Sequence, residues 1–396
     1  MKKHDVIICG AGIIGLCIAR ELVARGYRDI LVMDKEPHPG MHASGRNSGV
    51  LHAGIYYDPG TLKARMCLEG NRLMREYCRE NSLPLFESGK VIVARNSSEV
   101  HTLFELERRA TANGGNVEII DERQLEELEP NARTAGKALH SPLTAVVDPK
   151  SILKSLVRDL ERSGKVRFQW GSRFVKAGRN FITTDTDDLA YGLFINAAGA
   201  YSDKVAHSFG AGMDYRLIPF KGIYKTLRRP AADQIRGSIY PVPNINNPFL
   251  GVHFTRNVHD EVYLGPTAIP AFGRENYGLL RGIDAEAPAI LWRDALMFLN
   301  NRKFRSVALE EPRKYLSSCF FSDACDLVKE LRPEDVKDSP KAGIRPQLVN
   351  LRTHELVMDF MVEKVGNSVH VLNSISPAFT SAMSFSRMVT GEYIDK

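Results

Sequence analysis

Three glycines near the start of the chain, Gly10, Gly12 and Gly15, have the spacing that binds the pyrophosphate of a dinucleotide. The first glycine allows a sharp turn, the second lets the backbone approach the phosphates, and the third lets a helix pack closely on a strand. Asp34 follows roughly twenty residues later and can accept hydrogen bonds from both hydroxyls of the adenosine ribose. Its charge would repel a 2′-phosphate, which argues against NADP. The predicted dinucleotide-binding residues are Gly10, Ala11, Gly12, Ile13, Ile14, Gly15 and Asp34.

The residues around this turn predict the elements that position it. Residues 6–9 are apolar and indicate a buried strand, and apolar residues then recur at helical spacing from Leu16 to Val23. A second short apolar run, residues 30–33, ends directly before Asp34. The alternative is a chance glycine turn. The order of strand, turn, helix, strand and acid favours a dinucleotide-binding domain.

Three later segments have the composition of ligand-binding backbone. Residues 40–57 are rich in glycine, serine and histidine and are predicted to wrap around a ligand, with a surface loop as the alternative. Residues 197–200 are small and follow a buried strand, which suits either a ligand or close helix packing. Ser376 and Pro377 are an ordinary cap and first residue for a helix that runs to Ile394.

The rest of the chain predicts a second, different domain. Its 396 residues are too many for one ordinary core. Short strands with turns between residues 217 and 265 indicate an antiparallel sheet, while residues 276–331 are mostly helical. Residues 343–347, which include Arg345 beside Pro346, are predicted to form a loop. Helices are predicted at residues 62–78, 98–112, 121–130 and 148–160.

Composition excludes several classes of protein. The net charge of +6 is scattered, which argues against nucleic acid binding but permits a basic face for acidic substrates or anionic lipid headgroups. The six cysteines include no CxxC pair, which favours free thiols in a reducing compartment over disulfides or a metal site. We expect no metal, no signal peptide and no membrane-spanning segment, and a location in the cytoplasm or peripherally on the inner face of the membrane.

Several strings of residues resemble the L-2-hydroxyglutarate dehydrogenase/oxidase family, within the D-amino-acid oxidase and glycine oxidase superfamily of FAD enzymes. The resemblance covers nearly the whole chain, with departures at Arg46, at residues 351–355 and at residues 374–377. It implies an α/β, Rossmann-like FAD-binding domain of the D-amino-acid oxidase type interleaved with an antiparallel-sheet α+β substrate domain. The FAD-binding domain would comprise residues 1–88, 146–214 and 336–396, and the substrate domain residues 89–145 and 215–335. The strings are residues 47–57, 219–222, 239–243, 249–255, 264–266 and 343–345.

The resemblance also implies how FAD would lie. Its adenine would lie near Lys35 and the backbone of Val175, and its flavin between the loop at residues 44–52 and the small residues Ala198 and Gly199. The helix that starts at Pro377 would direct its amides at the flavin N1/C2=O edge, which becomes negative on reduction. The implied cofactor residues beyond the glycine turn are Lys35, Ser44, Asn47, Ser48, Gly49, Val175, Ala198, Gly199, Gly343, Ser376, Pro377, Ala378, Phe379 and Thr380.

The implied reaction is oxidation of L-2-hydroxyglutarate to 2-oxoglutarate by hydride transfer from C2 to flavin N5. A base must remove the hydroxyl proton, and His52 and His253 lie in the two most family-specific strings. Arg345 is the candidate for the carboxylate beside C2 because arginine binds carboxylates with two parallel hydrogen bonds. The distal carboxylate could use Lys221, Arg256 or Lys63. Tyr57, Tyr240 and Thr255 are candidate hydrogen-bond donors.

The sequence leaves alternatives open for the electron acceptor and for the reaction. The reduced flavin could pass its electrons to a quinone of the electron-transport chain or to O2. A second hypothesis within the superfamily is that the chain is an amine oxidase acting on glycine, sarcosine or a D-amino acid. A third is a flavoprotein that carries FAD without turnover. Reduction of the flavin by substrate without oxygen distinguishes an enzyme from such a carrier.

Overall fold

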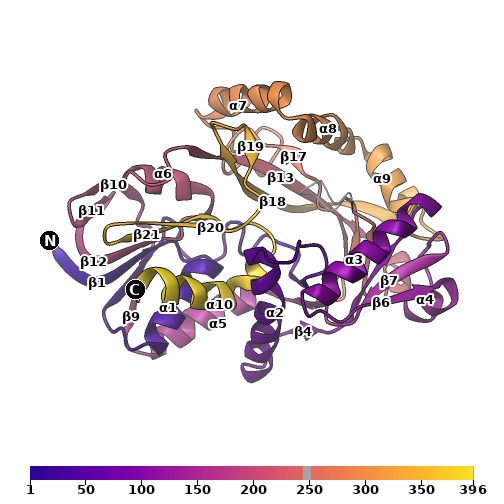
Figure 1. Cartoon of the computed structure of the whole chain (residues 1–396), viewed down its shortest axis with the longest axis horizontal. Helices are drawn as coiled ribbons and strands as arrows, with labels where there is room; N and C mark the ends of the chain where they lie inside the picture. The colour runs from indigo at the N-terminus through magenta and orange to yellow at the C-terminus, as the bar shows by residue number, and fades with distance from the viewer. Residues whose placement is uncertain (244–250, 396) are drawn as a thin grey trace.

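The structure is a computed structural model that describes residues 1–243 and 251–395. Two large sheets lie side by side, and helices cover their outer faces (Figure 1). Both chain ends belong to the part that holds the first sheet. The predicted strand at residues 249–255 lies partly outside the described residues; within them, only its last two residues belong to a strand, β15.

The eight-stranded sheet is built from the strands that the glycine turn predicts. Its central strands β21, β12, β1, β2 and β9 are parallel, and β10, β11 and β20 add antiparallel partners at the margins. The carboxyl ends of parallel strands meet at one edge of a sheet, which is where such folds bind ligands. The bounds are β1 Lys2–Cys9, β2 Ile30–Met33, β9 Val166–Gln169, β10 Phe174–Gly178, β11 Phe181–Thr184, β12 Asp188–Asn196, β20 Met361–Val365 and β21 Ser368–Asn373.

Helices bury one face of this sheet. In β1, Val6 and Ile8 point into a core shared with α1 (Ile13–Ala24), α5 (Pro149–Arg162) and α10 (Ala378–Val389). The alternate residues of β1 pack on the other face, with α6 (Ser202–His207). Both faces of β1 are therefore covered, which explains its nearly continuous apolar run.

The ten-stranded sheet is largely antiparallel and belongs to the second part of the chain. Its longest pairing joins β13 and β18 along almost their entire lengths, and Pro219 stands opposite Pro346 in that register. Because proline has no backbone N–H, the two prolines interrupt the hydrogen bonds between the strands at this one position. The bounds are β5 Lys90–Val93, β6 Glu118–Asp121, β7 Lys137–Ser141, β13 Tyr215–Leu227, β14 Ser238–Pro241, β15 Phe254–Arg256, β16 Val262–Leu264, β17 Ile269–Pro270, β18 Val336–Asn350 and β19 Glu355–Leu356.

The remaining helices surround these sheets. α2 (Leu62–Glu80) packs against α10, while α7 (Ala287–Asn300) and α8 (Arg302–Glu310) follow one another along the outer edge of the ten-stranded sheet (Figure 1). No helix in the described part of the chain is long and apolar enough to cross a membrane. The other elements are α3 Val100–Ala112, α4 Glu122–Leu128, α9 Ser317–Cys325, and a small sheet of β3 Val50–Leu51, β4 Leu85–Phe86 and β8 Ala145–Val147.

The predicted fold class is confirmed, with corrections at two places. Residues 343–347 are part of β18 and do not form a loop, because they pair with β13. The predicted boundary at residue 336 therefore does not divide the sheets, since β18 belongs to the ten-stranded one. Ser376 does not cap the last helix: α10 begins at Ala378, and Pro377 precedes it without a side-chain capping bond.

Candidate functional site

A cavity of about 600 Å³ lies where the two sheets meet. One end, which we call the nucleotide end, is lined by the glycine turn and by Asp34. The other, which we call the sheet end, is lined by side chains of the ten-stranded sheet, among them Tyr240 and Arg345. The cavity therefore joins a nucleotide-type cradle to side chains of the ten-stranded sheet.

The nucleotide end is formed by the carboxyl ends of parallel strands. β1 ends at Cys9 and leads to the glycine turn, and β2 ends at Met33, directly before Asp34. The Asp34 carboxylate accepts hydrogen bonds from the backbone N–H of Ala11 at 2.8 Å and of Glu36 at 2.9 Å. These bonds fix the carboxylate and leave further lone pairs for ribose hydroxyls.

Two helix N-termini reach the same cavity without a capping side chain of their own. α1 begins after Gly12, and the Ile13 N–H donates to Ser44 Oγ at 3.0 Å. α10 begins after Pro377, which also lines the cavity. Uncapped N–H groups and the helix dipole attract negative charge. These residues fit FAD: α1 suits its pyrophosphate, and α10 suits the flavin edge that becomes negative on reduction.

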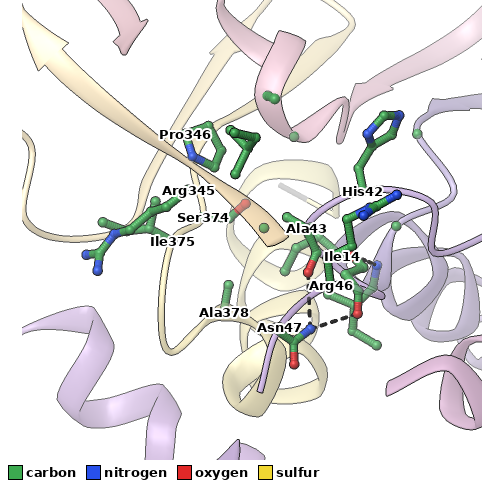
Figure 2. Close-up of a pocket in the computed structure, with 18 of the residues that line it drawn as sticks. Ile14, His42, Ala43, Arg46, Asn47, Arg345, Pro346, Ser374, Ile375 and Ala378 are labelled. Carbon is green, nitrogen blue, oxygen red and sulfur yellow. Dashed lines mark hydrogen bonds between the residues drawn. The ribbon is translucent and has the colours of Figure 1, made fainter. Parts of the chain in front are cut away.

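The predicted ligand-wrapping loop, residues 40–57, is held by its own side chains. Asn47 Nδ2 donates to the carbonyl oxygens of Ala43 at 3.1 Å and Ser44 at 2.7 Å (Figure 2). Asn47 Oδ1 accepts from the Gly49 N–H at 2.9 Å. The loop is therefore shaped internally before any ligand binds, which lowers the entropy cost of binding.

The segment at residues 272–286 closes over the nucleotide end. Its Glu275 accepts hydrogen bonds from Lys35 Nζ at 2.8 Å and from the Tyr201 hydroxyl at 2.6 Å. Its Tyr277 hydroxyl lies 2.7 Å from His42 Nδ1, and the Arg46 guanidinium lies 4.1 Å from the Tyr277 ring centre. This second part of the chain thus covers the predicted adenosine position.

The group of Glu36, His42 and Glu275 has ligand atoms close enough to hold a metal ion. The Lys35 ammonium lies among them, 2.9 Å from His42 Nε2 and also paired with Glu36. A lysine in this position supplies the positive charge that the two carboxylates attract. The expectation of no metal stays a prediction.

Two histidines face the sheet end. His253 Nδ1 lies 2.9 Å from the Gly251 carbonyl oxygen, so Nδ1 carries the proton in the neutral ring and Nε2 keeps its lone pair. The His253 ring stacks on Tyr240 with centres 3.8 Å apart. Burial, together with the nearby Lys90 charge, lowers the pKa of His52 and of His253 to about 3 each. Both rings are therefore neutral at physiological pH and able to accept a proton.

Two buried lysines lie behind the lining of the sheet end, Lys90 near the two histidines and Lys63 near Arg345. Lys90 is 1 % exposed; its Nζ donates to the Tyr56 hydroxyl at 3.0 Å and lies 4.7 Å from the Tyr240 ring centre. Lys63 is buried at the start of α2 and faces Arg345. Burial lowers the pKa of each lysine to about 7. Within the described residues, neither lysine ammonium forms an ion pair with a carboxylate.

Asp359, the carboxylate whose charge partly offsets the effect of burial on the pKa of Lys63, already accepts other hydrogen bonds. The two Asp359 carboxylate oxygens accept the backbone N–H groups of Leu62 at 2.8 Å and Lys63 at 3.0 Å. This carboxylate therefore stabilises the N-terminus of α2. Arg345 adds a third positive charge at the sheet end, and it lies across the 374–375 segment from His42 and Arg46 (Figure 2). The sheet end is positive before any ligand enters.

Most predicted site residues line this one cavity, although they come from distant parts of the chain. The glycine turn lies at its nucleotide end, and both histidines lie at its sheet end. The predicted residues that line it are Gly10, Ala11, Gly12, Ile13, Ile14, Asp34, Lys35, Ser44, Asn47, Ser48, His52, Val175, Ala198, Gly199, Tyr240, His253, Gly343, Arg345, Ser376, Pro377, Ala378, Phe379 and Thr380.

The structure corrects the prediction that Lys221 and Arg256 bind substrate. Phe220 and Gly222 line the cavity, so strand alternation turns Lys221 to the other face, where its Nζ donates to the Gly278 carbonyl at 2.7 Å. The Arg256 guanidinium is held by the carbonyl oxygens of Ala232 and Ile235, each at 2.6 Å, and by Asp260. Neither cation reaches the cavity.

Five other predicted residues lie behind the cavity wall, among them Lys63. Gly15 packs against Gly10, and Gly49 against the Val147 carbonyl. Thr255 is buried beside Tyr240, and Tyr57 lies next to Arg345. These residues support the lining without forming it.

Sequence reasoning missed Lys90 and Tyr277. A signal for Lys90 was present, because it is a lysine at the start of an otherwise apolar strand, residues 90–93. Burying a lysine charge in such a strand is unfavourable unless another group or a ligand stabilises it. Tyr277 gave no signal, since it follows an irregular segment and meets its partners only through the tertiary fold.

Comparison with known proteins agrees with this geometry. The model of a family described as FAD dependent oxidoreductase matches residues 5–391. The chain belongs to this family. Its cofactor is FAD, and the predicted enzyme class is confirmed.

Relatives refine the resemblance found in the sequence. The chain is 34 % identical to the mitochondrial L-2-hydroxyglutarate dehydrogenase of Caenorhabditis briggsae, over 100 % of this chain and 94 % of that protein. It is 33 % identical to the L-2-hydroxyglutarate dehydrogenase of Indibacter alkaliphilus, over 96 % of each. The predicted family resemblance is confirmed.

A solved structure shows the same fold with the cofactor bound. The L-alpha-glycerophosphate oxidase of Mycoplasma pneumoniae, described with FAD bound, superposes with a TM-score of 0.76 at 22 % sequence identity. The match covers 98 % of this chain and 94 % of that one. At this identity the likeness concerns the fold alone.

Replacing Asp34 tests the nucleotide end. Asp34→Ala removes the carboxylate that orients the Ala11 and Glu36 amides and that would accept the ribose hydroxyls. Because hydrogen bonds to a charged group contribute about 1.5–3 kcal/mol, FAD affinity should fall roughly 10- to 100-fold. Titration of the apoprotein with FAD, followed by quenching of flavin fluorescence, measures this. Asp29→Ala, at the opposite end of β2, is the control and should bind FAD normally.

Proposed function

We propose that this chain oxidises L-2-hydroxyglutarate to 2-oxoglutarate and passes the electrons to a quinone or to oxygen. The observation that carries the proposal is the positive sheet end, where Lys63 and Lys90 are buried and Arg345 is half-buried. Lys63 and Lys90 form no ion pair with a carboxylate among the described residues, and a buried lysine in this situation is unfavourable unless a ligand supplies negative charge. A substrate with two carboxylates meets this requirement, and the names of the relatives support the same choice.

The same charges oppose the amine-oxidase alternative. An amino acid substrate brings one carboxylate and a protonated amine, so it adds a positive charge next to the lysines. A hydroxy diacid brings two negative charges and a neutral hydroxyl. The electrostatic preference of the sheet end is therefore for the diacid.

The chain's own residues can then bind, orient and deprotonate the alcohol. We assign Arg345 to binding of the carboxylate beside C2. The positive charges of Lys63 and Lys90 would attract the distal carboxylate. His253 Nε2 is the proposed base, because Nδ1 is held by the Gly251 carbonyl and the lone pair is left on Nε2. His52 is the alternative base. When bound, FAD supplies the acceptor for the hydride that leaves C2.

A substrate panel without oxygen tests the proposal. The purified holoenzyme should lose its flavin absorbance with L-2-hydroxyglutarate, and far more slowly with D-2-hydroxyglutarate, L-lactate, glycine, sarcosine or glycerol 3-phosphate. L-lactate is the matched control because it has the same hydroxy acid group without the distal carboxylate. Reduction by glycine or sarcosine, with none by the diacid, would replace this function with amine oxidation.

One variant tests the carboxylate assignment in the same assay. Arg345→Leu should retain FAD but require a much higher substrate concentration for half-maximal reduction, because a bidentate charged contact is lost. Unchanged half-saturation would remove Arg345 from the substrate site.

The proposed base can be identified by its effect on the chemical step. His253→Asn keeps a polar side chain but cannot accept a proton, so the anaerobic reduction rate at saturating substrate should fall by about 10²- to 10⁴-fold. Substrate affinity should change little. His52→Asn is the matched comparison. If it alone slows reduction to that degree, His52 is the base and the assignment to His253 is wrong.

The two lysines predict a pH dependence of substrate affinity. Their pKa values are lowered to about 7, so their positive charge is present below pH 7 and is lost as the pH rises through that value. The substrate carboxylates stay ionised above about pH 5. The KM should therefore rise from pH 6 to pH 9, while the neutral histidines contribute nothing in this range.

Removal of one lysine should weaken that pH dependence. Lys90→Met keeps the apolar stem and lacks the titrating group, so its KM should be higher at pH 6 and should rise less toward pH 9. Lys221→Met, a buried lysine turned away from the cavity, is the control. A wild-type KM that is constant from pH 6 to pH 9 would contradict the role given to Lys63 and Lys90.

A further inference from the structure

Helix α7 exposes the side that a water-facing helix normally buries. Leu291, Ala295 and Leu299 form a stripe at spacings of four residues, and all three are exposed, as is the neighbouring Trp292. Trp292 is 66 % exposed and Leu299 is 68 % exposed. A surface helix usually places polar residues on its outer face. The outer stripe of α7 is apolar.

The charged residues of α7 are turned the other way. Arg293 and Asp294 are partly buried, and Arg293 Nη1 and Asp294 Oδ1 find no hydrogen-bond partner among the described residues. Leaving buried polar atoms unpaired costs free energy, as does exposing leucine and tryptophan to water. This orientation is unfavourable on both sides if water is the only surrounding medium.

The apolar stripe is part of a larger surface. More than half of the large apolar side chains that the described residues expose lie between residues 279 and 316. Figure 1 shows α7 and α8 in succession along the outer edge of the ten-stranded sheet. We call this surface the α7–α8 ridge. Its exposed large apolar residues are Leu279, Leu280, Ile283, Leu291, Trp292, Leu299, Leu309, Tyr315 and Leu316.

Exposed arginines accompany these apolar residues. Arg302 and Arg305 share the outer stripe of α8 with Leu309. Arg281 lies within the ridge before α7, and Arg313 lies within it after α8. None of these arginines forms an ion pair with a carboxylate in the described part of the chain, and Arg305 instead binds the last carbonyl groups of α7. The exposed acids between residues 279 and 316 are Asp284 and Glu310.

We propose that the α7–α8 ridge docks this protein onto an anionic lipid bilayer, with Trp292 and the leucines inserted at the interface and the arginines at the headgroups. Leucine and tryptophan on one side, with basic residues beside them, is the composition of helices that lie in a membrane surface. A second copy of this chain would place arginine against arginine across the contact. An anionic surface satisfies both the apolar and the basic residues of the ridge.

The docking surface is separate from the cavity lining. The inner side of α7 contributes Ile290 and Met297 to a core with Ile218 of β13 and Val349 of β18. Both strands also contribute residues to the cavity wall. A membrane on α7 would thus lie behind the ten-stranded sheet, whereas Leu279, Leu280 and Ile283 of the ridge belong to the segment that covers the nucleotide end. The proposal does not depend on the identity of the substrate.

Vesicle sedimentation of the holoenzyme tests the proposal. The protein should sediment with vesicles of phosphatidylcholine and phosphatidylglycerol, and much less with phosphatidylcholine alone. The double variant Trp292→Glu/Leu299→Glu should lose this binding while keeping bound FAD and its reduction by substrate. Phe104→Glu, an exposed aromatic on α3 outside the ridge, is the matched control and should bind as the wild type does.

Separate measurements test the insertion of Trp292 into the bilayer and the attraction of the arginines to the headgroups. Trp170→Phe leaves Trp292 as the single tryptophan, and its emission should shift to the blue and be quenched by brominated lipid chains. Each of Arg302→Ala and Arg313→Ala should weaken partitioning about fivefold at low salt.

Absence of vesicle binding, or binding that the double glutamate variant leaves unchanged, would overturn the proposal. So would a concentration-dependent dimer that this variant abolishes in the absence of lipid, because a second copy would then be the occupant.

Discussion

The cavity depends on a place where three stretches of backbone lie almost in contact. A Cβ atom on Gly15 would lie 1.9 Å from the Gly10 carbonyl oxygen, and one on Gly10 would lie 2.3 Å from the Ala197 carbonyl oxygen. Gly10 also has φ +113°, which favours glycine. Any side chain here would separate β1, α1 and the end of β12. The phosphate-binding turn and the small residues beside the flavin position therefore share one cavity only because these residues are glycines.

A second close approach couples the cofactor and the substrate ends. At Gly70 of α2, a Cβ atom would lie 2.4 Å from the Thr380 carbonyl oxygen of α10. The start of α10 has no side-chain cap, and Thr380 Oγ1 accepts the His52 N–H at 3.1 Å. α2 also carries Lys63. Packing of α2 on α10 thus sets the distance between the flavin-edge amides, a candidate base and a substrate cation.

The sequence predicted what local patterns determine and failed where the third dimension decides. The glycine turn and its strands were predictable because each glycine has a local steric reason. Arg345 was predicted in a loop because Gly343 and Pro346 are strand breakers, yet pairing with β13 places it in β18. Lys221 was misplaced because nothing local reveals which face of β13 lines the cavity. Lys90 acts through neighbours distant in sequence, so spacing could not reveal its role.

The proposed chemistry requires that binding of the substrate raise the pKa of the histidine that deprotonates it. A histidine with a pKa of about 3 is a weak acceptor for an alcohol proton. The difference between this pKa and the ordinary histidine value of about 6.5 means that protonating the buried ring costs roughly 5 kcal/mol more. A carboxylate about 4 Å from the ring would stabilise the protonated form by about 4 kcal/mol at an effective dielectric constant near 20. Entry of the diacid would also offset the repulsion from Lys90. Burial and the Lys90 charge thus keep His253 neutral before binding, and the negative charge of the bound substrate would restore its basicity afterwards.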